Sequence, residues 1–585
     1  MVTNKYITRI ASVIMAAAVI LCLMASLFSD KLQEVYGNNA VTMKYESKLF
    51  STDQIMDIDI LMDEDDWNDM LENAISEEYY SCDVVVNGKT FYSVGIRPKG
   101  NTSLSSIVND PDTDRYSFKL EFDHYIEGQT CYGLDKLILN NNYADATNMK
   151  EAIVYDMYQY LGVDASLYNY AKISVNGDYR GVYLALEAVE DSFMLRNYGT
   201  EDGNLYKPES MGIGGGVDGN GFPQKGEMPD GEDFPQKGEM PDGADFPQKG
   251  EMPDGEDFPQ KGEMPDGEDF PQMGEAPNGE AADIKMGIMG GNGGADLNYT
   301  DDDLDSYSTI WDGEITDSDK KDHKRVVEAL KNISEGTDLE TYMDVDNILK
   351  YMAVHTFVVN DDSLFGTMAH NYYLYEYNGK LNILPWDYNL SFGGMSMGGG
   401  MGGQSSGATS VINDAIDTPF SITSFFDALL ENEEYLEQYH EYLNELVEKY
   451  VNGGEFEKTY ERIRSQIDDL VGNDPTAFYS YEEYEEAANM LIEVVQLRAK
   501  SVSGQLAGTI PSTDEGQQQD SSNLIDGSDI DLSVMGSFSG GGGGNEGQGK
   551  DNGFAGTPQP FDAGDVSPIS EEKADLQDSN QDSVK

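Results

Sequence analysis

Residues Val354–Gly394 read VHTFVVNDDSLFGTMAHNYYLYEYNGKLNILPWDYNLSFGG, and this stretch decides how the second half of the chain folds. Its two strand-like runs, NYYLYEY and KLNILPW, are separated by Asn378-Gly379. Asn-Gly between alternating hydrophobic residues is the strongest short-range signal for a β-hairpin. Asp361 and Asp362 precede the hairpin, and Asp387 follows it. Because a hairpin brings its ends together, we expect these carboxylates to converge, as a hard cation and the phosphate that it carries require.

An isolated aspartate beside a turn is more often a turn residue than a ligand, so the surrounding sequence has to decide. Further motifs occur in one order along the chain. They are GIRPKGNTS (95–103), SFKLEF (117–122), YRGVYLALE (179–187), GNLYK (203–207), NDDSLFG (360–366), HNYYLY (370–375) and LPWDYNLSFG (384–393). This ordered set resembles the signature of the CotH family, which are atypical protein kinases of the spore-coat type.

The resemblance covers roughly residues 55–210 and 342–451. It implies an α+β fold like that of a two-lobed protein kinase, with a strand-rich N-lobe over 45–210 and a helical C-lobe over 297–507. The chain has no GxGxxG loop, no HRD and no DFG, so it is not an ordinary protein kinase. The GxxxxGK[ST] loop of P-loop enzymes is also missing.

Charge and composition exclude several classes of partner. The chain has 108 acidic and 37 basic residues, a formal net charge of −71, so we expect no nucleic-acid binding and no polybasic membrane surface. The five histidines show no zinc-ligand spacing. Cys82 and Cys131 have the opportunity to pair in an oxidising compartment, but their spacing does not decide whether they do.

The N-terminal sequence predicts where the protein is located. Lys5 and Arg9 precede an apolar run from Ile10 to Phe28, which nearly spans a bilayer core of about 30 Å. We interpret residues 1–30 as a cleaved signal peptide or a retained membrane anchor. The rest of the chain is then expected to be an extracytoplasmic domain, at the cell surface or in a spore coat.

Two polar side chains in the first half suggest a lysine–glutamate pair. Lys119 lies in the middle of a predicted strand, on the opposite face from Phe118 and Leu120. Residues Asn148–Gly162 predict an amphipathic helix with Asn148 as N-cap, Glu151 at N3 and the glycine at C′. A solvated lysine and a capping-box glutamate are the simpler interpretation. The kinase resemblance instead implies that Lys119 pairs with Glu151.

The resemblance also implies roles at the hairpin. Asp387 would hold Mg²⁺ or Mn²⁺ together with Asn389, although an amide weakens a site at which relatives carry a second carboxylate. Asp362 or Asp361 would accept the proton of the substrate hydroxyl, with Asn371 beside it. Contacts to ATP would come from five residues, the last of them at a predicted hinge: Arg97, Lys99, Lys119, Glu151 and Glu187.

Two segments predict disorder. A twelve-residue repeat, FPQKGEMPDGED, begins at Phe222 and recurs from Phe234, Phe246 and Phe258, with a degenerate copy from Phe270. Its prolines, glycines and few apolar residues cannot offset chain entropy, so we expect a disordered insertion over 211–296. The Gly-, Ser- and Asp-rich tail over 508–585 is expected to be disordered for the same reason.

The sequence therefore favours an ATP-dependent protein kinase that phosphorylates serine or threonine of a spore-coat or cell-surface protein. The alternative is a non-catalytic adhesion or coat-assembly scaffold on the same fold. A glycoside hydrolase is less well supported, because paired carboxylates alone would leave a lysine–glutamate pair unexplained.

Overall fold

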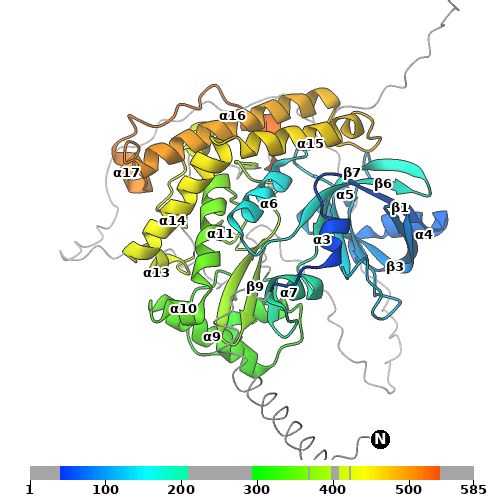
Figure 1. The fold of residues 1–585 in the computed structure, drawn as a ribbon, viewed down its shortest axis with the longest axis horizontal. Helices are drawn as coiled ribbons and strands as arrows, with labels where there is room; N and C mark the ends of the chain where they lie inside the picture. The colour runs from blue at the N-terminus through cyan, green and yellow to red at the C-terminus, as the bar shows by residue number, and fades with distance from the viewer. Residues whose placement is uncertain (1–39, 209–292, 367–368, 397–406, 421–422, 540–585) are drawn as a thin grey trace, which may run out of the picture. The chain divides into compact units, whose positions relative to one another are not determined.

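The computed structural model describes residues 40–208, 293–366, 369–396, 407–420 and 423–539 (Figure 1). The predicted anchor over 1–30 and the twelve-residue repeats lie outside these residues. Within the described ranges, no helix is both long enough and apolar enough to cross a membrane. The protein is a mixed α+β structure, with strands concentrated in the first part of the chain and helices in the second.

Seven strands of the first part form a closed barrel in the order β1-β2-β3-β4-β5-β7-β6. Their bounds are β1 Met56–Leu61, β2 Tyr80–Val86, β3 Lys89–Lys99, β4 Ser117–Glu121, β5 Lys136–Asn140, β6 Tyr168–Val175 and β7 Asp178–Glu187. The sequence predicts a strand-rich N-lobe but neither β5 nor the closure of the strands into a barrel, which depends on a parallel pairing of β1 with β6. Alternate residues such as Ile58, Ile96 and Phe118 fill the interior. Cys82 and Cys131 are buried and free, so no disulfide joins them.

The hairpin predicted at Asn378-Gly379 is confirmed, and two other Asn-Gly pairs form hairpins of the same kind. Asn87-Gly88 joins β2 to β3, Asn176-Gly177 joins β6 to β7, and Asn378-Gly379 joins β9 (Tyr372–Tyr377) to β10 (Lys380–Pro385). Both residues of each pair have positive φ. This is the backbone of a type I′ turn, whose twist matches the twist of the paired strands.

Helix α6 spans Lys150–Leu161, as the periodicity predicts, and ends at Gly162 in the left-handed conformation with φ 74°. Its predicted N-cap, Asn148, is wrong. The helix begins one residue later than expected, and the Asp145 carboxylate accepts hydrogen bonds from the backbone N–H groups of Thr147 and Lys150 at 2.9 and 3.0 Å. Glu151 is consequently the second residue of the helix and is available for contacts outside a capping box.

Helices build most of the second part around one large apolar cluster. The main ones are α9 Lys320–Ser334, α11 Val345–Val358, α14 Glu433–Glu445, α15 Glu455–Val471 and α16 Tyr481–Leu506, with a π-helical turn over Leu446–Val451. α11 packs against α6 and α14 (Figure 1). A sheet ordered β10-β9-β8, in which β8 is Asn204–Tyr206, lies against α9 and α11.

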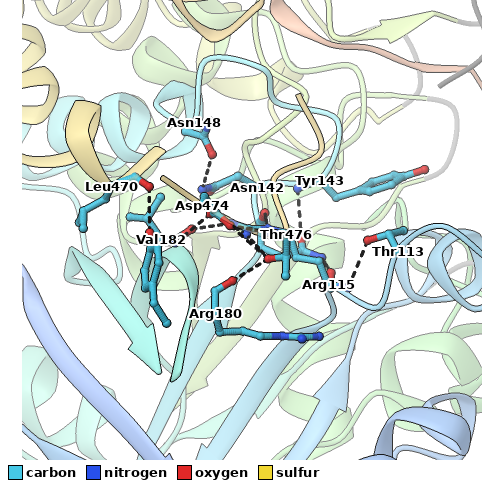
Figure 2. A network of polar contacts seen from close by, with 12 residues as sticks. Thr113, Arg115, Asn142, Tyr143, Asn148, Arg180, Val182, Leu470, Asp474 and Thr476 are labelled. Atoms are coloured by element: carbon cyan, nitrogen blue, oxygen red, sulfur yellow. Dashed lines mark hydrogen bonds and ion pairs between the residues drawn. The ribbon is translucent and has the colours of Figure 1, made fainter. Parts of the chain in front are cut away.

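A buried polar network fastens the barrel to the helical part (Figure 2). Arg115 Nη1 lies 2.7 Å from Asp474 Oδ2, and both side chains are 2% exposed. Arg115 also donates to the carbonyl oxygens of Val182 and Asn141, at 2.6 and 3.1 Å. The Asp474 carboxylate accepts in addition from the Val182 N–H at 3.1 Å. This satisfied ion pair fixes the segment after α15 against β7.

The prediction of a disordered tail from residue 508 is wrong for residues 508–539. They contain α17 (Asp514–Gln519), a 3₁₀ turn over Leu532–Met535 and β12 (Phe538–Ser539). Ile510 and Met535 are buried, at 4% and 1% exposure. These scattered apolar residues become buried because the segment lies along a folded surface, which average composition does not reveal. Residues 540–585 lie outside the described part of the chain.

Candidate functional site

Lys99 is the last residue of β3, and its side chain leaves the barrel surface toward the hairpin. Its Nζ donates to Asn140 Oδ1 at 3.2 Å and lies 5.7 Å from the ring centre of Trp386. Burial lowers the pKa of Lys99, and the carboxylate of Asp387 opposes that shift. The Lys99 side chain therefore lies beside Asn140 and Trp386, where its charge interacts with that of Asp387.

Glu151 lies on the other side of Asn140, whose Nδ2 donates to Glu151 Oε2 at 2.9 Å. The side chain comes from the first turn of α6 and is 3% exposed. Its other oxygen, Oε1, is buried and has no hydrogen-bond partner among the described residues. Burial, reinforced by the Asp387 charge, raises the pKa of Glu151 to about 8. A buried acceptor without a donor is a position at which a bound cation or donor would be stabilised.

Asp387 follows β10 with a φ of 60°. Burial raises its pKa, the Lys99 ammonium opposes this, and the negative charge of Asp362 adds to it. Lys207 and His370 are the other cationic groups whose field lowers the pKa of this carboxyl. The predicted convergence of the carboxylates on either side of the hairpin is therefore confirmed for Asp362 and Asp387.

Asp362 is oriented by its neighbours. Asn371 Nδ2 donates to Asp362 Oδ2 at 3.0 Å and to the Asp362 carbonyl oxygen at 2.9 Å. His370 Nε2 lies 2.8 Å from Asp362 Oδ1. The preceding Asp361 has an exposed side chain. These contacts distinguish the two aspartates that the sequence left as alternatives, because Asp362 is the one held by His370 and Asn371, the two residues directly before β9.

The backbone around the site is strained at several positions. Asn371 and Asp387 have φ of 58° and 60°, which asparagine and aspartate tolerate better than most residues. Val359, immediately before Asn360, has φ 49°, an unusual value for a β-branched residue. Such outliers cluster at functional sites, where the surrounding structure holds them in place. Their grouping on both sides of the hairpin supports a site at this position.

The predicted ion pair between Lys119 and Glu151 is wrong. Lys119 instead pairs with Glu190, which it shares with Lys136. The register explains the difference. Lys119 is paired with Arg97, which lies two residues before the end of β3. Lys99 is at the end of β3, on a level with Asn140 of β5, and its hydrogen bond to Asn140 brings it near Glu151 of α6. Alternation places both lysines on one face, so the sequence does not determine which of them meets the glutamate.

Three further predicted residues have partners of their own. Glu187 is fully buried and accepts from Arg196 Nη2 at 2.6 Å and from the Tyr45 hydroxyl at 2.5 Å, so a role as a hinge contact to ATP does not fit its surroundings. Arg97 pairs with Glu77 on the outer surface of β3. Asn389 Nδ2 donates to the Tyr143 carbonyl oxygen at 2.8 Å, which turns this amide group toward the loop before α6.

Sequence reasoning missed Asn140, Lys207 and His370. The last two stand inside quoted motifs, GNLYK and HNYYLY, so the signal was present but carried no assigned role. Lys207 directly follows β8, which pairs with β9 of the hairpin. This pairing places Lys207 close enough to Asp387 for its charge to lower the pKa of that carboxyl. Asn140 had no local signal, because its importance comes from lying between Lys99 and Glu151.

The arrangement suits a divalent cation that arrives with a phosphate. Within the described ranges, no group of three or more His, Cys, Asp or Glu side chains is arranged to hold a metal by itself. Mg²⁺ usually takes only one or two carboxylates and completes its shell with phosphate oxygens and water. Asp387 and Asp362 provide that number, the unpaired oxygen of Glu151 lies beside them, and Lys99 and Lys207 supply positive charge.

The fold and this centre together define an α+β protein with a lysine–carboxylate site between a barrel and a helical part. The chain belongs to the CotH family. The family model described as CotH kinase protein matches residues 96–502, a range that contains every site residue described above. No curated protein matches the chain.

Proposed function

We propose that the protein is a phosphotransferase that moves the γ-phosphate of ATP to a serine or threonine hydroxyl of a protein. The observation that carries this proposal is the convergence of Lys99, Glu151, Asp362 and Asp387 from four separate segments. In this interpretation the barrel corresponds to the N-lobe of a kinase, and the helical part corresponds to the C-lobe.

Charge distribution supports a polyphosphate ligand. The chain has a net charge of −71, yet one outer surface of β3, β4 and β5 carries four cations, namely Arg97, Lys99, Lys119 and Lys136. Arg97 pairs with Glu77, Lys119 with Glu190, and Lys136 with Glu190, Glu121 and Asp135, whereas Lys99 donates to the neutral amide of Asn140. Lys99 is therefore the cation of this row that is best placed to bind an anionic ligand such as a phosphate.

Phosphoryl transfer depends mainly on alignment and charge neutralisation. Lys99 and Lys207 would bind phosphate oxygens, and Asp387, with Asp362 and the free oxygen of Glu151 beside it, would hold Mg²⁺ or Mn²⁺. When bound, that ion neutralises the charge on the phosphates. Glu151 would ionise as positive charge enters, because its raised pKa comes from burial and a neighbouring negative charge.

Asp362 is the best-placed group to accept the proton of the substrate hydroxyl. Its two carboxylate oxygens are fixed by Asn371 and His370, so the side chain has one orientation rather than several. Asp361, one residue away, is exposed and lies where it would meet the protein substrate. We extend the proposal to an anchored, extracytoplasmic enzyme that acts on a coat or surface protein, on the basis of the N-terminal sequence.

The test is phosphoryl transfer by the purified full chain with γ-labelled ATP and Mg²⁺ or Mn²⁺. Asp387→Asn and Asp362→Asn are each expected to lower transfer by about 10²-fold or more, because the charge at the reacting phosphate is no longer balanced. Asp469→Asn, at an exposed position on α15, is the matched control. Absence of both transfer and any nucleotide-dependent shift in the melting temperature of folded protein would sink the proposal and favour the scaffold.

A further inference from the structure

The last described residues, 524–539, run across the helical part and end beside the candidate site. We call them the C-terminal strap. They lie outside the 96–502 range matched by the family model. Their first contacts are with the segment that contains α12 (Ala408–Ile412). The Ile525 N–H donates to Asn413 Oδ1 at 2.9 Å, Asn413 Nδ2 donates back to the Ile525 carbonyl at 2.8 Å, and the Gly527 N–H donates to Thr409 Oγ1 at 3.0 Å.

The strap ends between two loops. The carbonyl oxygen of Met535 accepts from the Ala146 N–H at 3.1 Å, and the Phe538 N–H donates to the Gly394 carbonyl at 2.9 Å. β12 then continues in parallel with β11 (Met395–Ser396). Gly536, with φ 83°, lies so close to the first loop that a Cβ at this position would be 2.5 Å from the Ala144 carbonyl oxygen. The fit therefore depends on a glycine.

Each of these loops is next to one of the two central carboxylates. The 142–148 loop leads into α6, whose second residue is Glu151, and its Asp145 caps that helix. The 388–396 segment follows Asp387 directly. Asn389 donates to the Tyr143 carbonyl oxygen between these two stretches, and the hydroxyl groups of Tyr158 in α6 and Tyr388 lie 2.5 Å apart. The strap adds a hydrogen bond to each side, and Phe538 packs against the cluster of Ala144, Leu390 and Met395.

The same place buries the amino group of a lysine. Lys150 is fully buried, and within the described ranges its Nζ has no hydrogen-bond partner. The nitrogen is 3.0 Å from the position that a Cβ on Gly394 would take, and Gly394 is the residue whose carbonyl oxygen accepts from the Phe538 N–H of the strap. Burial lowers the pKa of Lys150, and the charge of Asp145 opposes that shift. Because burying an amino group without a hydrogen-bond partner is unfavourable, water admitted by detachment of the strap would stabilise Lys150, and attachment of the strap is expected to be reversible.

We propose that the C-terminal strap is a positioning element that holds the Glu151 and Asp387 segments together, and that its attachment sets the activity of the site. The effect of the strap on activity rests on the proposed function. Its role in keeping the two segments together does not. A detached strap would leave the barrel and the helical core in place, because the Arg115–Asp474 pair joins them elsewhere (Figure 2).

The test is hydrogen–deuterium exchange on the full chain without nucleotide, comparing the native protein with Gly536→Val. A valine side chain cannot enter the space beside Ala144, and the residue resists a positive φ. Exchange in the 142–151 and 388–396 segments is expected to accelerate by about tenfold or more, while α15 exchanges as before. Ser537→Ala, one residue along and exposed, is the matched control. If Gly536→Val does not fold, Met535→Ala replaces it.

The inference would be overturned if the two segments exchanged at the same rate in the native and Gly536→Val proteins. It would also be overturned if exchange in Gly536→Val accelerated as much in α15 as in the two segments. Lys150→Met provides an independent arm, because removing the buried amino group is expected to slow exchange in the same two segments. If the native chain transfers phosphate, the strap variant is expected to lose kcat by about tenfold or more with a smaller change in KM. If it does not, the proposed function fails, and exchange alone decides the inference.

Discussion

Replacing Glu151 by glutamine is expected to change how the stability of the protein depends on pH. The side chain is 3% exposed, and its pKa is raised from about 4.5 to about 8 by burial and by Asp387. A carboxyl with a raised pKa binds more protons in the folded state than in the unfolded state. Folding stability from this group is therefore fully present below pH ~4.5, falls as pH rises, and is lost above pH ~8.

The size of the effect follows from the shift. Each pKa unit corresponds to about 1.4 kcal/mol, so the free energy of unfolding is expected to decline by roughly 3–5 kcal/mol across this window because of Glu151. Glu151→Gln keeps the shape and the hydrogen-bonding capacity but has no proton to lose. The variant should resemble the native protein near pH 5 and exceed its stability near pH 9.

Urea unfolding of both proteins from pH 5 to pH 9 measures the difference. Asp414, whose pKa burial raises to about 7, also titrates in this range, but it is present in both proteins and its contribution cancels in the comparison. Asp387 and Lys99 interact with Glu151, so their response to its removal is part of the measured difference. Glu127→Gln, at an exposed position, is the control and should parallel the native protein. A difference between native and Glu151→Gln proteins that stays constant with pH would refute the argument that Glu151 is buried and largely protonated.

Three further outcomes are expected. Lys99→Met should lower kcat/KM for ATP by about 10²-fold, whereas Lys119→Met should lower it by less than about tenfold, because Lys99 is the lysine beside Asn140 and the catalytic carboxylates. Gly366→Ala should lower the melting temperature and the activity together, since its Cβ would be 1.6 Å from the Asp361 carbonyl oxygen and the loop has to move at a cost of about 1–3 kcal/mol. Asp474→Asn should lower the free energy of unfolding in urea by about 3–5 kcal/mol, because it leaves a buried guanidinium without its counter-charge.

Each of these has a result that would contradict it. Similar losses of kcat/KM in Lys99→Met and Lys119→Met would mean that Lys99 contributes no more to ATP binding or catalysis than Lys119 does. A Gly366→Ala protein with native melting temperature and native turnover would show that the loop accommodates a methyl group. An Asp474→Asn protein with unchanged stability would show that the interior network does not depend on the ion pair (Figure 2).

Sequence by itself determined the parts of the fold that depend on neighbouring residues. Each Asn-Gly pair specifies a hairpin because the turn requires positive φ at two consecutive residues, and few other dipeptides supply it. Apolar periodicity and Gly162 placed α6 to within one or two residues. The hairpin between Asn360 and Asp387 also predicted the meeting of Asp362 with Asp387, because chain connectivity alone brings the two ends of a hairpin together.

Tertiary structure decided everything that depends on pairing between distant segments. The choice of Lys99 over Lys119 follows from the register of β3, β4 and β5, since alternation puts both lysines on the same face. Closure of the barrel needs β1 beside β6, and the burial of Glu187 needs Arg196 and Tyr45. The strap is ordered because scattered residues such as Met535 find a surface that exists only in the folded chain. Local preferences are encoded by adjacent side chains, whereas these contacts join residues tens to hundreds of positions apart, and no local pattern carries that information.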